Sequence, residues 1–171
     1  MIIRPYLPQD VPAMTAIWNE VVTTGRAFPQ VDALGEDAAA EFFAAQTRTA
    51  VAVDGEDVLG LYILHPNDIG RKAHIANASY AVRKDARGRG VGRALVTDSL
   101  AQLIPCGFRG MQFNAVVASN TAAIKLYESL GMRQVGTIPG GFESVDGFQD
   151  MHIYFYEALP QGEADTQTGQ K

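Results

Sequence analysis

Apolar residues recur at two spacings along this chain, and the alternation between these spacings predicts a mixed α/β fold. A spacing of three and four residues predicts a helix that begins at Asp10 and further helices at residues 36–46, 90–104 and 120–130. Shorter apolar or alternating runs predict strands at residues 2–7, 50–54, 58–65, 73–82, 110–117, 135–138 and 151–156. The elements therefore follow the order β, α, α, β, β, β, α, β, α, β, β.

Turn residues predict how these elements connect. Residues 54–57 form a hairpin signal between the second and third strands, and Gly107 and Gly131 are expected to end the last two helices. Because several glycines lie at positions 139–150, we expect a long loop between the last two strands. Trp18 lies on the apolar stripe of the first helix, which predicts a place in the core.

The composition predicts one globular domain. Of the 171 residues, 47% are hydrophobic and 19% are charged, which fits a single domain over residues 1–159. Residues 160–171 contain almost nothing apolar, so we expect a disordered tail there. The formal net charge of -5 argues against nucleic acid as a partner. Since we find no apolar leader and no apolar run of 18 residues, we expect a cytoplasmic protein that does not enter a membrane.

Cysteine chemistry is not expected to carry the function. Cys106 is the single cysteine, which excludes an internal disulfide and any zinc site built from several cysteines. No histidine motif accompanies Cys106, so we do not expect it to act as a nucleophile.

Positive charge is concentrated in one stretch between a predicted strand and a predicted helix. The basic residues of this stretch are Arg83, Lys84, Arg87, Arg89 and Arg93, and three glycines, Gly88, Gly90 and Gly92, alternate along it. Glycine lets backbone N–H groups approach an anion, and the helix start adds its positive dipole end. A P-loop is excluded because no lysine follows Gly92, and a dinucleotide site because Asn114 stands where an acidic residue is needed.

Two motifs of the chain resemble those of the GCN5-related N-acetyltransferase (GNAT) superfamily. Residues 87–92 match the pattern Arg/Gln-x-x-Gly-x-Gly/Ala, and residues 120–132 match Asn-x-x-Ala-x-x-x-Tyr-x-x-x-Gly-Phe with methionine at the last position. The resemblance covers residues 1–158. It implies the acyl-CoA N-acyltransferase fold, a single α/β domain whose mixed, mostly antiparallel sheet has helices on both faces and splayed central strands.

The resemblance also implies acetyl-CoA as the cosubstrate and no metal. The coenzyme pyrophosphate would bind the loop formed by Arg87, Gly88, Arg89, Gly90, Val91, Gly92 and Arg93. The backbone of Ala81 and Val82 would pair with the pantetheine arm. For Asn120, contact with the cofactor and pure helix capping both stay open.

Tyr127 occupies the position that the family commonly uses as a general acid toward the departing thiolate. A neutral phenol with a pKa near 10 is suited to protonate a thiolate of similar basicity. The alternative is a core tyrosine on the apolar stripe of its helix, which phenylalanine would replace without loss.

The acceptor side departs from the common family pattern, because residues 73–82 contain no carboxylate that would act as a base. Asn77 and Asn114 lie in mid-strand, where a buried amide needs a specific partner. They resemble the asparagines that meet the acceptor in the yeast proline-analogue acetyltransferase branch. The alternative is that these amides pair internally. The base also stays open between His74, acting through water, and loss of the amine proton to solvent.

Residues 17–28 resemble the segment that lines the acceptor pocket of phosphinothricin-type acetyltransferases, which implies substrate contacts for Phe28 and Glu20. Together the resemblances imply an acetyl-CoA-dependent N-acetyltransferase that acts directly on a small-molecule amine, such as an amino acid or an analogue. The alternatives are acetylation of a protein N-terminus or lysine, and a non-catalytic acetyl-CoA sensor. The oligomeric state stays open, although a homodimer is common in the superfamily.

Overall fold

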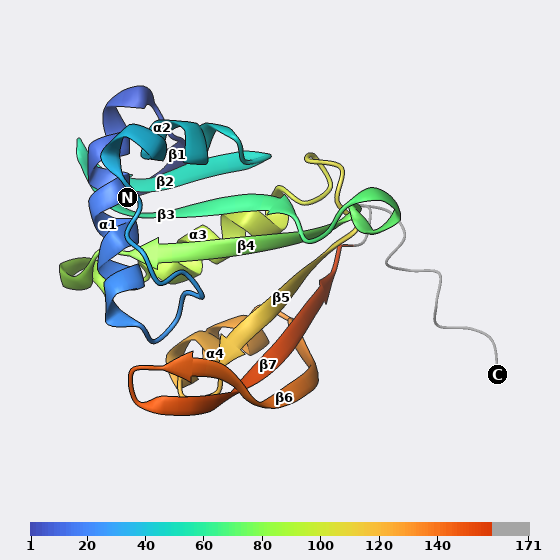
Figure 1. The fold of residues 1–171 in the computed structure, drawn as a ribbon. Coiled ribbons are helices and arrows are strands. Elements are labelled where there is room, and N and C mark those ends of the chain that lie inside the picture. Colours follow the sequence, from blue (N-terminus) through green and yellow to red (C-terminus); the bar gives the residue numbers. More distant parts are fainter. Residues whose placement is uncertain (159–171) are drawn as a thin grey trace.

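The computed structural model describes residues 1–158, so the predicted tail at 160–171 lies outside the described residues. Within this range one sheet of seven strands has the order β1-β2-β3-β4-β5-β7-β6 (Figure 1). Every neighbouring pair is antiparallel except β4 with β5, which is parallel. The strands are β1 (Ile2–Pro5), β2 (Arg48–Asp54), β3 (Asp57–Pro66), β4 (Ile75–Val82), β5 (Gly110–Val117), β6 (Arg133–Ser144) and β7 (Gly147–Glu157).

Helices cover both faces of this sheet (Figure 1). They are α1 (Val11–Thr24), α2 (Glu36–Ala44), α3 (Val91–Ala101) and α4 (Thr121–Ser129), with short 3-10 turns at Pro8–Asp10, Gly70–Lys72 and Lys84–Ala86. Trp18 of α1 and Phe43 of α2 belong to the core on one face, and Leu95 of α3 belongs to the core on the other. The predicted element order and α/β class are therefore confirmed.

Cover on both faces explains the composition of the central strands. Residues 49–53 of β2 and 58–64 of β3 are buried without interruption, because side chains on either face meet a helix layer. Trp18 is 2% exposed, which confirms its predicted place in the core. Burial of one large apolar side chain stabilises the fold by about 1.5–3 kcal/mol.

The sheet opens between β4 and β5. Only Ile75 with Gly110 and Ala76 with Met111 pair across these strands, after which the strands diverge (Figure 1). The open ends leave backbone N–H and C=O groups without a ladder partner, and such groups need another partner. This opening is where the candidate site lies.

The prediction of a long loop between the last two strands is wrong. β6 and β7 instead form a long hairpin whose ladder reaches Ser144 with Gly147, so residues 145–146 alone make the turn. The ladder shifts register between Ile138 and Phe142, because residues 139–141 form a bulge instead of ending the strand. Proline and glycine, which punctuate a sequence as turn residues, are tolerated at such a bulge in an edge strand.

The end of α3 and the cap of α1 also differ from expectation. α3 ends at Ala101 instead of residue 104, and the chain then turns through Gly107, which has a φ of 85°. Asp10 precedes α1 but makes no side-chain cap bond; its carboxylate accepts hydrogen bonds from Leu7 N–H and from Arg4 instead. Gly131 has a φ of 88° just beyond α4, as predicted.

Candidate active site

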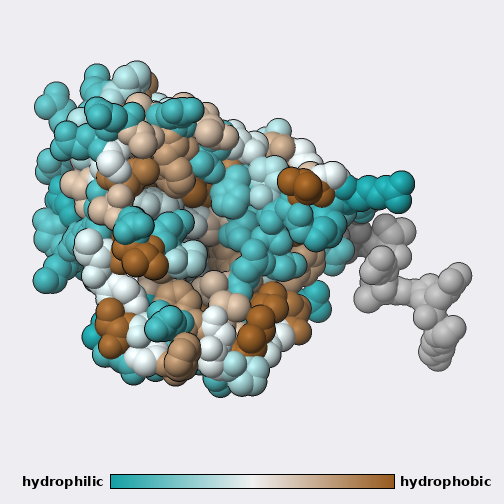
Figure 2. Space-filling model, in the orientation of Figure 1, coloured by the Kyte–Doolittle hydropathy of each residue, from teal (hydrophilic) through white to brown (hydrophobic). Residues whose placement is uncertain are grey.

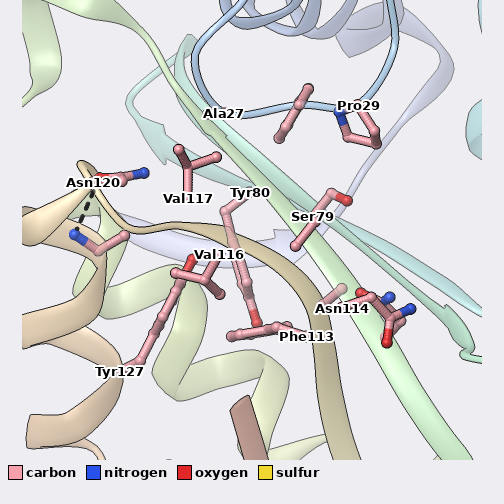
Figure 3. Close-up of a pocket in the computed structure, with 15 residues that line it drawn as sticks. Ala27, Pro29, Ser79, Tyr80, Phe113, Asn114, Val116, Val117, Asn120 and Tyr127 are labelled. Atoms are coloured by element: carbon pink, nitrogen blue, oxygen red, sulfur yellow. Dashed lines mark hydrogen bonds between the residues drawn. The ribbon is translucent and has the colours of Figure 1, made fainter. Parts of the chain in front are cut away.

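A cavity of about 230 Å³ lies in the opening between β4 and β5. Its walls come from the loop after α1, from β4 and β5, and from α4 (Figure 3). The space-filling view shows the surface hollowed between the β1–β4 half of the molecule and the β6–β7 hairpin (Figure 2). Among the described residues, those that line the cavity include polar and aromatic side chains but none with a formal charge.

The glycine loop lies between the end of β4 and the start of α3. Gly88 and Gly90 have φ values of 77° and 82°, and no atom lies within 4 Å of the place where a Cβ would stand on either residue. Gly90 is the N-cap of α3 and provides no side-chain cap, so first-turn N–H groups are free to meet an anion. Gly92 is different, because a Cβ there would make ordinary contacts with Leu126 at 3.8 Å and Val82 at 3.9 Å.

The loop arginines are each held by a neighbour. Arg93 Nη2 donates to Ser129 Oγ at 2.8 Å, and Arg87 Nε donates to the Val82 carbonyl at 3.4 Å. Arg89 lies 3.6 Å from the Asp54 carboxylate, with both side chains about half exposed. These contacts keep three guanidinium groups around the start of α3, where they favour an anion.

The hydrogen-bond alternation of β4 shows which backbone groups face the opening. The Asn67 N–H donates to Ile75 C=O, and Arg83 N–H donates to Leu59 C=O, so the odd-numbered residues of β4 pair with β3. The even-numbered residues therefore direct their N–H and C=O groups toward β5. Val82 thus directs its N–H to the opening, while its C=O accepts the bond from Arg87, and the backbone of Ala81, against expectation, is directed to Leu61 of β3.

Tyr127 projects from α4 into the cavity wall (Figure 3). Its ring centroid lies 4.7 Å from that of Phe113 and 6.5 Å from that of Tyr80. Burial raises the pKa of Tyr127 to about 12, and no other cause contributes to the shift. The phenol is therefore neutral at every physiological pH and keeps a proton that it can donate.

Tyr80 also lines the cavity, but its hydroxyl is engaged. The hydroxyl shares a hydrogen bond of 2.7 Å with Ser99 Oγ and lies 3.6 Å from the Met111 sulfur. Burial raises the pKa of Tyr80 well above its ordinary value. Tyr80 therefore bonds back into the core under α3, and Tyr127 is the better placed proton donor of the two.

Asn77 and Asn114 meet through a third asparagine that the sequence analysis did not single out. Asn67 Oδ1 accepts hydrogen bonds from Asn77 Nδ2 at 3.0 Å and from Asn114 Nδ2 at 2.6 Å. Asn67 lies in the polar connection between β3 and β4. The only sequence signal is an amide directly after a strand, which is far too common to indicate a site.

Asn120 caps α4 and also faces the cavity. Its Oδ1 accepts a hydrogen bond from Ala123 N–H at 3.3 Å, while its side-chain nitrogen points away from the helix (Figure 3). Capping and ligand contact are therefore compatible. Phe28 also lines the cavity, and its ring lies 4.5 Å from that of Trp18.

Two other candidates, Glu20 and His74, do not line this cavity, and neither does Cys106, which was not expected to react. Glu20 Oε2 accepts a hydrogen bond from Lys84 N–H at 3.3 Å, outside the opening. His74 is exposed one residue before β4 begins. For Cys106, burial raises the pKa of the thiol, which disfavours the reactive thiolate.

Among residues 1–158 there is no cluster of three side chains suited to hold a metal ion. Within the same range no helix is long and apolar enough to cross a membrane.

Comparison with known proteins places this arrangement in a family. The model of the "Acetyltransferase (GNAT) family" matches residues 14–132, which is more than half of the chain. The chain belongs to the GNAT family. It is 35% identical over 101 residues to N-acetyltransferase aca1 of Schizosaccharomyces pombe, an alignment that covers 58% of this chain and 48% of that protein. The chain thus spans about half the length of this relative.

Solved GNAT structures share the fold across nearly the whole chain. A GCN5-related N-acetyltransferase from Kribbella flavida is 38% identical, with a TM-score of 0.85 and coverage of 91% of this chain and 96% of that one. A phosphinothricin acetyltransferase from Sinorhizobium meliloti, in complex with AcCoA, has a TM-score of 0.87 at 22% identity and covers 95% and 90%. At 22% identity, the similarity to the Sinorhizobium meliloti structure shows the fold alone. The predicted GNAT family and fold are confirmed.

Proposed function

We propose that this GNAT protein transfers acetyl from acetyl-CoA directly to the amine of a small molecule. The observation that carries the proposal is the opening between β4 and β5, which joins the glycine loop at one end to a small uncharged cavity beside Tyr127. Acetyl-CoA supplies the acetyl group as a thioester. Acetyl transfer also requires that acetyl-CoA is bound in place, that the amine is neutral and that the leaving thiolate receives a proton.

The residues at the loop end fit the pyrophosphate of coenzyme A. Gly88 and Gly90 leave open space over the loop, and the uncapped start of α3 presents N–H groups with the positive end of the helix dipole. The three arginines around it add charge of the required sign. We propose that Val82, whose N–H faces the opening, pairs with the pantetheine arm in preference to Ala81.

Tyr127 is the proposed general acid. Its raised pKa keeps the hydroxyl protonated, so that the proton is available when the carbon–sulfur bond breaks and negative charge develops on sulfur. Among the described residues no charged side chain in the cavity acts as a base. The amine is therefore expected to enter in its neutral form, after losing its proton to water.

The size of the cavity favours a small acceptor. A volume of about 230 Å³ accommodates a compact molecule and leaves no room for a folded chain. Beside it, Val145 N–H donates to Gly25 C=O at 3.3 Å, and Arg26 pairs with Asp146. These contacts join the loop after α1 to the β6–β7 turn, so the two halves of the diverging sheet meet again next to the cavity.

A thiol-release assay tests the proposal. Acetyl-CoA is mixed with the protein and a panel of amino acids, amino-acid analogues and polyamines, and mass spectrometry identifies the acetylated product. We expect release of coenzyme A that depends on one class of small amine. Acetyl-CoA binding without release for any amine or peptide would instead indicate the sensor function.

A cytoplasmic location and a homodimer stay predictions. β6 is an edge strand of the described sheet, and its Val135 and Ile138 are 59% and 44% exposed, which supports an assembly through this edge. Light scattering during size-exclusion chromatography measures the mass of the particle. A mass of one chain would exclude the dimer.

A further inference from the structure

Asn67 stands at the point where the sheet opens. It follows β3 directly, and its Oδ1 accepts one hydrogen bond from Asn77 of β4 and one from Asn114 of β5. Those two strands have stopped pairing with each other, because their ladder ends at Ala76 with Met111. One carbonyl oxygen therefore holds two amides on the diverging strands.

The main chain of Asn67 is fixed without help from its side chain. The Asn67 N–H donates to Ile75 C=O at 2.8 Å, which extends the β3–β4 ladder by one bond beyond Pro66 with Ala76. Removal of the carboxamide therefore leaves the connection anchored. The side chain is free for another task, and its two bonds reach only amides that line the cavity.

The hydrogen bonds to Asn67 determine which atoms of its partners remain available. Asn114 is held at both ends, since its Oδ1 also accepts from Gln112 Nε2 at 2.8 Å. Asn77 is held through its nitrogen, and among the described residues no donor engages its Oδ1. A carbonyl oxygen accepts and cannot donate, so this end of the cavity favours a ligand that brings an N–H.

We infer that Asn67 is a positioning residue for the acceptor: it fixes the carboxamides of Asn77 and Asn114 so that Asn77 Oδ1 receives the amine N–H. The inference rests on the proposed function. Asn67 itself does not contact the acceptor and acts through Asn77 and Asn114. Without it, Asn77 loses its side-chain partner and Asn114 keeps only the bond from Gln112, so the site loses its preorganised acceptor.

Steady-state kinetics of Asn67→Ala test this role. With the best amine of the panel, we expect KM for the amine to rise about tenfold, the scale of one or two hydrogen bonds, while kcat at saturating amine stays within about threefold. The dissociation constant of acetyl-CoA, measured by calorimetry, should stay unchanged. Lys72→Ala, an exposed position in the same connection, is the control and should leave all three values unchanged.

Asn67→Asp separates positioning from a merely structural role. A carboxylate oxygen still accepts from both amides, so this variant should return KM to within about threefold of the wild type. Three results would overturn the inference while the proposed function stands. Asn67→Ala could keep the wild-type KM for the amine, or lose as much affinity for acetyl-CoA as for the amine. Asn67→Asp could fail to restore the KM. A wild-type protein that acetylates no amine would overturn both.

Discussion

Tyr127 combines a wall position in the cavity with a half-buried ring that packs among other aromatic side chains. Its aromatic neighbours supply the desolvation that raises its pKa to about 12, and the cavity gives the hydroxyl access to a ligand. A core tyrosine without a catalytic role would show the raised pKa but would not reach the cavity. The catalytic and the structural interpretation of Tyr127 therefore differ in one measurable respect: whether the reaction uses the proton of the Tyr127 hydroxyl.

Tyr127→Phe should lower kcat by about a hundredfold, at the lower end of what general acid catalysis contributes. The dissociation constant of acetyl-CoA should change little, because phenylalanine fills the same space. Steady-state kinetics and calorimetry measure the two effects separately. The matched control is Tyr154→Phe, since the Tyr154 ring lies 6.3 Å from that of Tyr127 but its hydroxyl bonds Glu128 outside the cavity. Equal turnover in wild type and Tyr127→Phe would remove the hydroxyl from the mechanism.

The asparagines illustrate what single residues reveal in a sequence. Asn77 and Asn114 are noticeable because amides are poor strand formers, and both do line the cavity. The expectation of a specific partner is met by Asn67, which is the internal pairing that the sequence left open. Asn67 was missed because its significance comes from the meeting of three segments, which no local pattern encodes.

At the scale of elements, the turn from β4 into α3 is encoded locally. Gly88 and Gly90 take positive φ values that other residues adopt only under strain, and the helix that follows lacks a side-chain cap. The sequence therefore predicts this element well. The β6–β7 hairpin was mispredicted because the same residue types, glycine and proline, form a bulge in one context and a turn in another.

Gly90→Ala should weaken acetyl-CoA binding about tenfold or more, because alanine disfavours the φ of 82° by about 1–2 kcal/mol and the loop would shift. Calorimetric titration with acetyl-CoA measures this change. Gly107→Ala is the matched control, since Gly107 has a φ of 85° and equally open space but lies in the turn between α3 and β5. If both variants lost equal affinity, or neither did, the loop would not be the pyrophosphate site.

The start of α1 is stabilised by a partly buried ion pair instead of a cap. Asp10 is 4% exposed, and Arg4 Nη1 and Nη2 donate to its carboxylate at 2.6 Å and 3.0 Å. The hydrogen bond from Arg4, more than any other contact, lowers the pKa of Asp10. The folded state thus holds the proton less tightly than the unfolded chain does. The resulting stability is present above the unfolded pKa of about 3.9 and is lost as the pH falls through the lower folded pKa.

Asp10→Asn should reduce the free energy of unfolding at pH 7 by about 1.5–3 kcal/mol, the value of hydrogen bonds to charged groups. Denaturant unfolding at a series of pH values measures it. The gap between wild type and variant should narrow below about pH 4, since protonation of Asp10 removes the same interaction from the wild type. A gap that stayed constant down to about pH 2 would contradict the ion-pair account.

At the scale of the whole molecule, the order of elements follows from the sequence, whereas the opening of the sheet does not. The pattern of residues 73–82 predicts a strand but cannot show that its ladder with β5 stops after two pairs. Long-range geometry of this kind was supplied by the family resemblance, and the contacts that close the cavity, from Gly25 to Val145 and from Arg26 to Asp146, were not foreseen. The size of the acceptor depends on those contacts.

The most direct test of a small-molecule acetyltransferase compares one amine in two settings. The kcat/KM is measured for the best free amino acid or amine of the panel and for the same group at the N-terminus or on a lysine of a ten-residue peptide. Because the cavity is small and the β6–β7 turn contacts the loop beside it, we predict that the free molecule is favoured at least about tenfold. An equal or higher kcat/KM for the peptide would contradict the account.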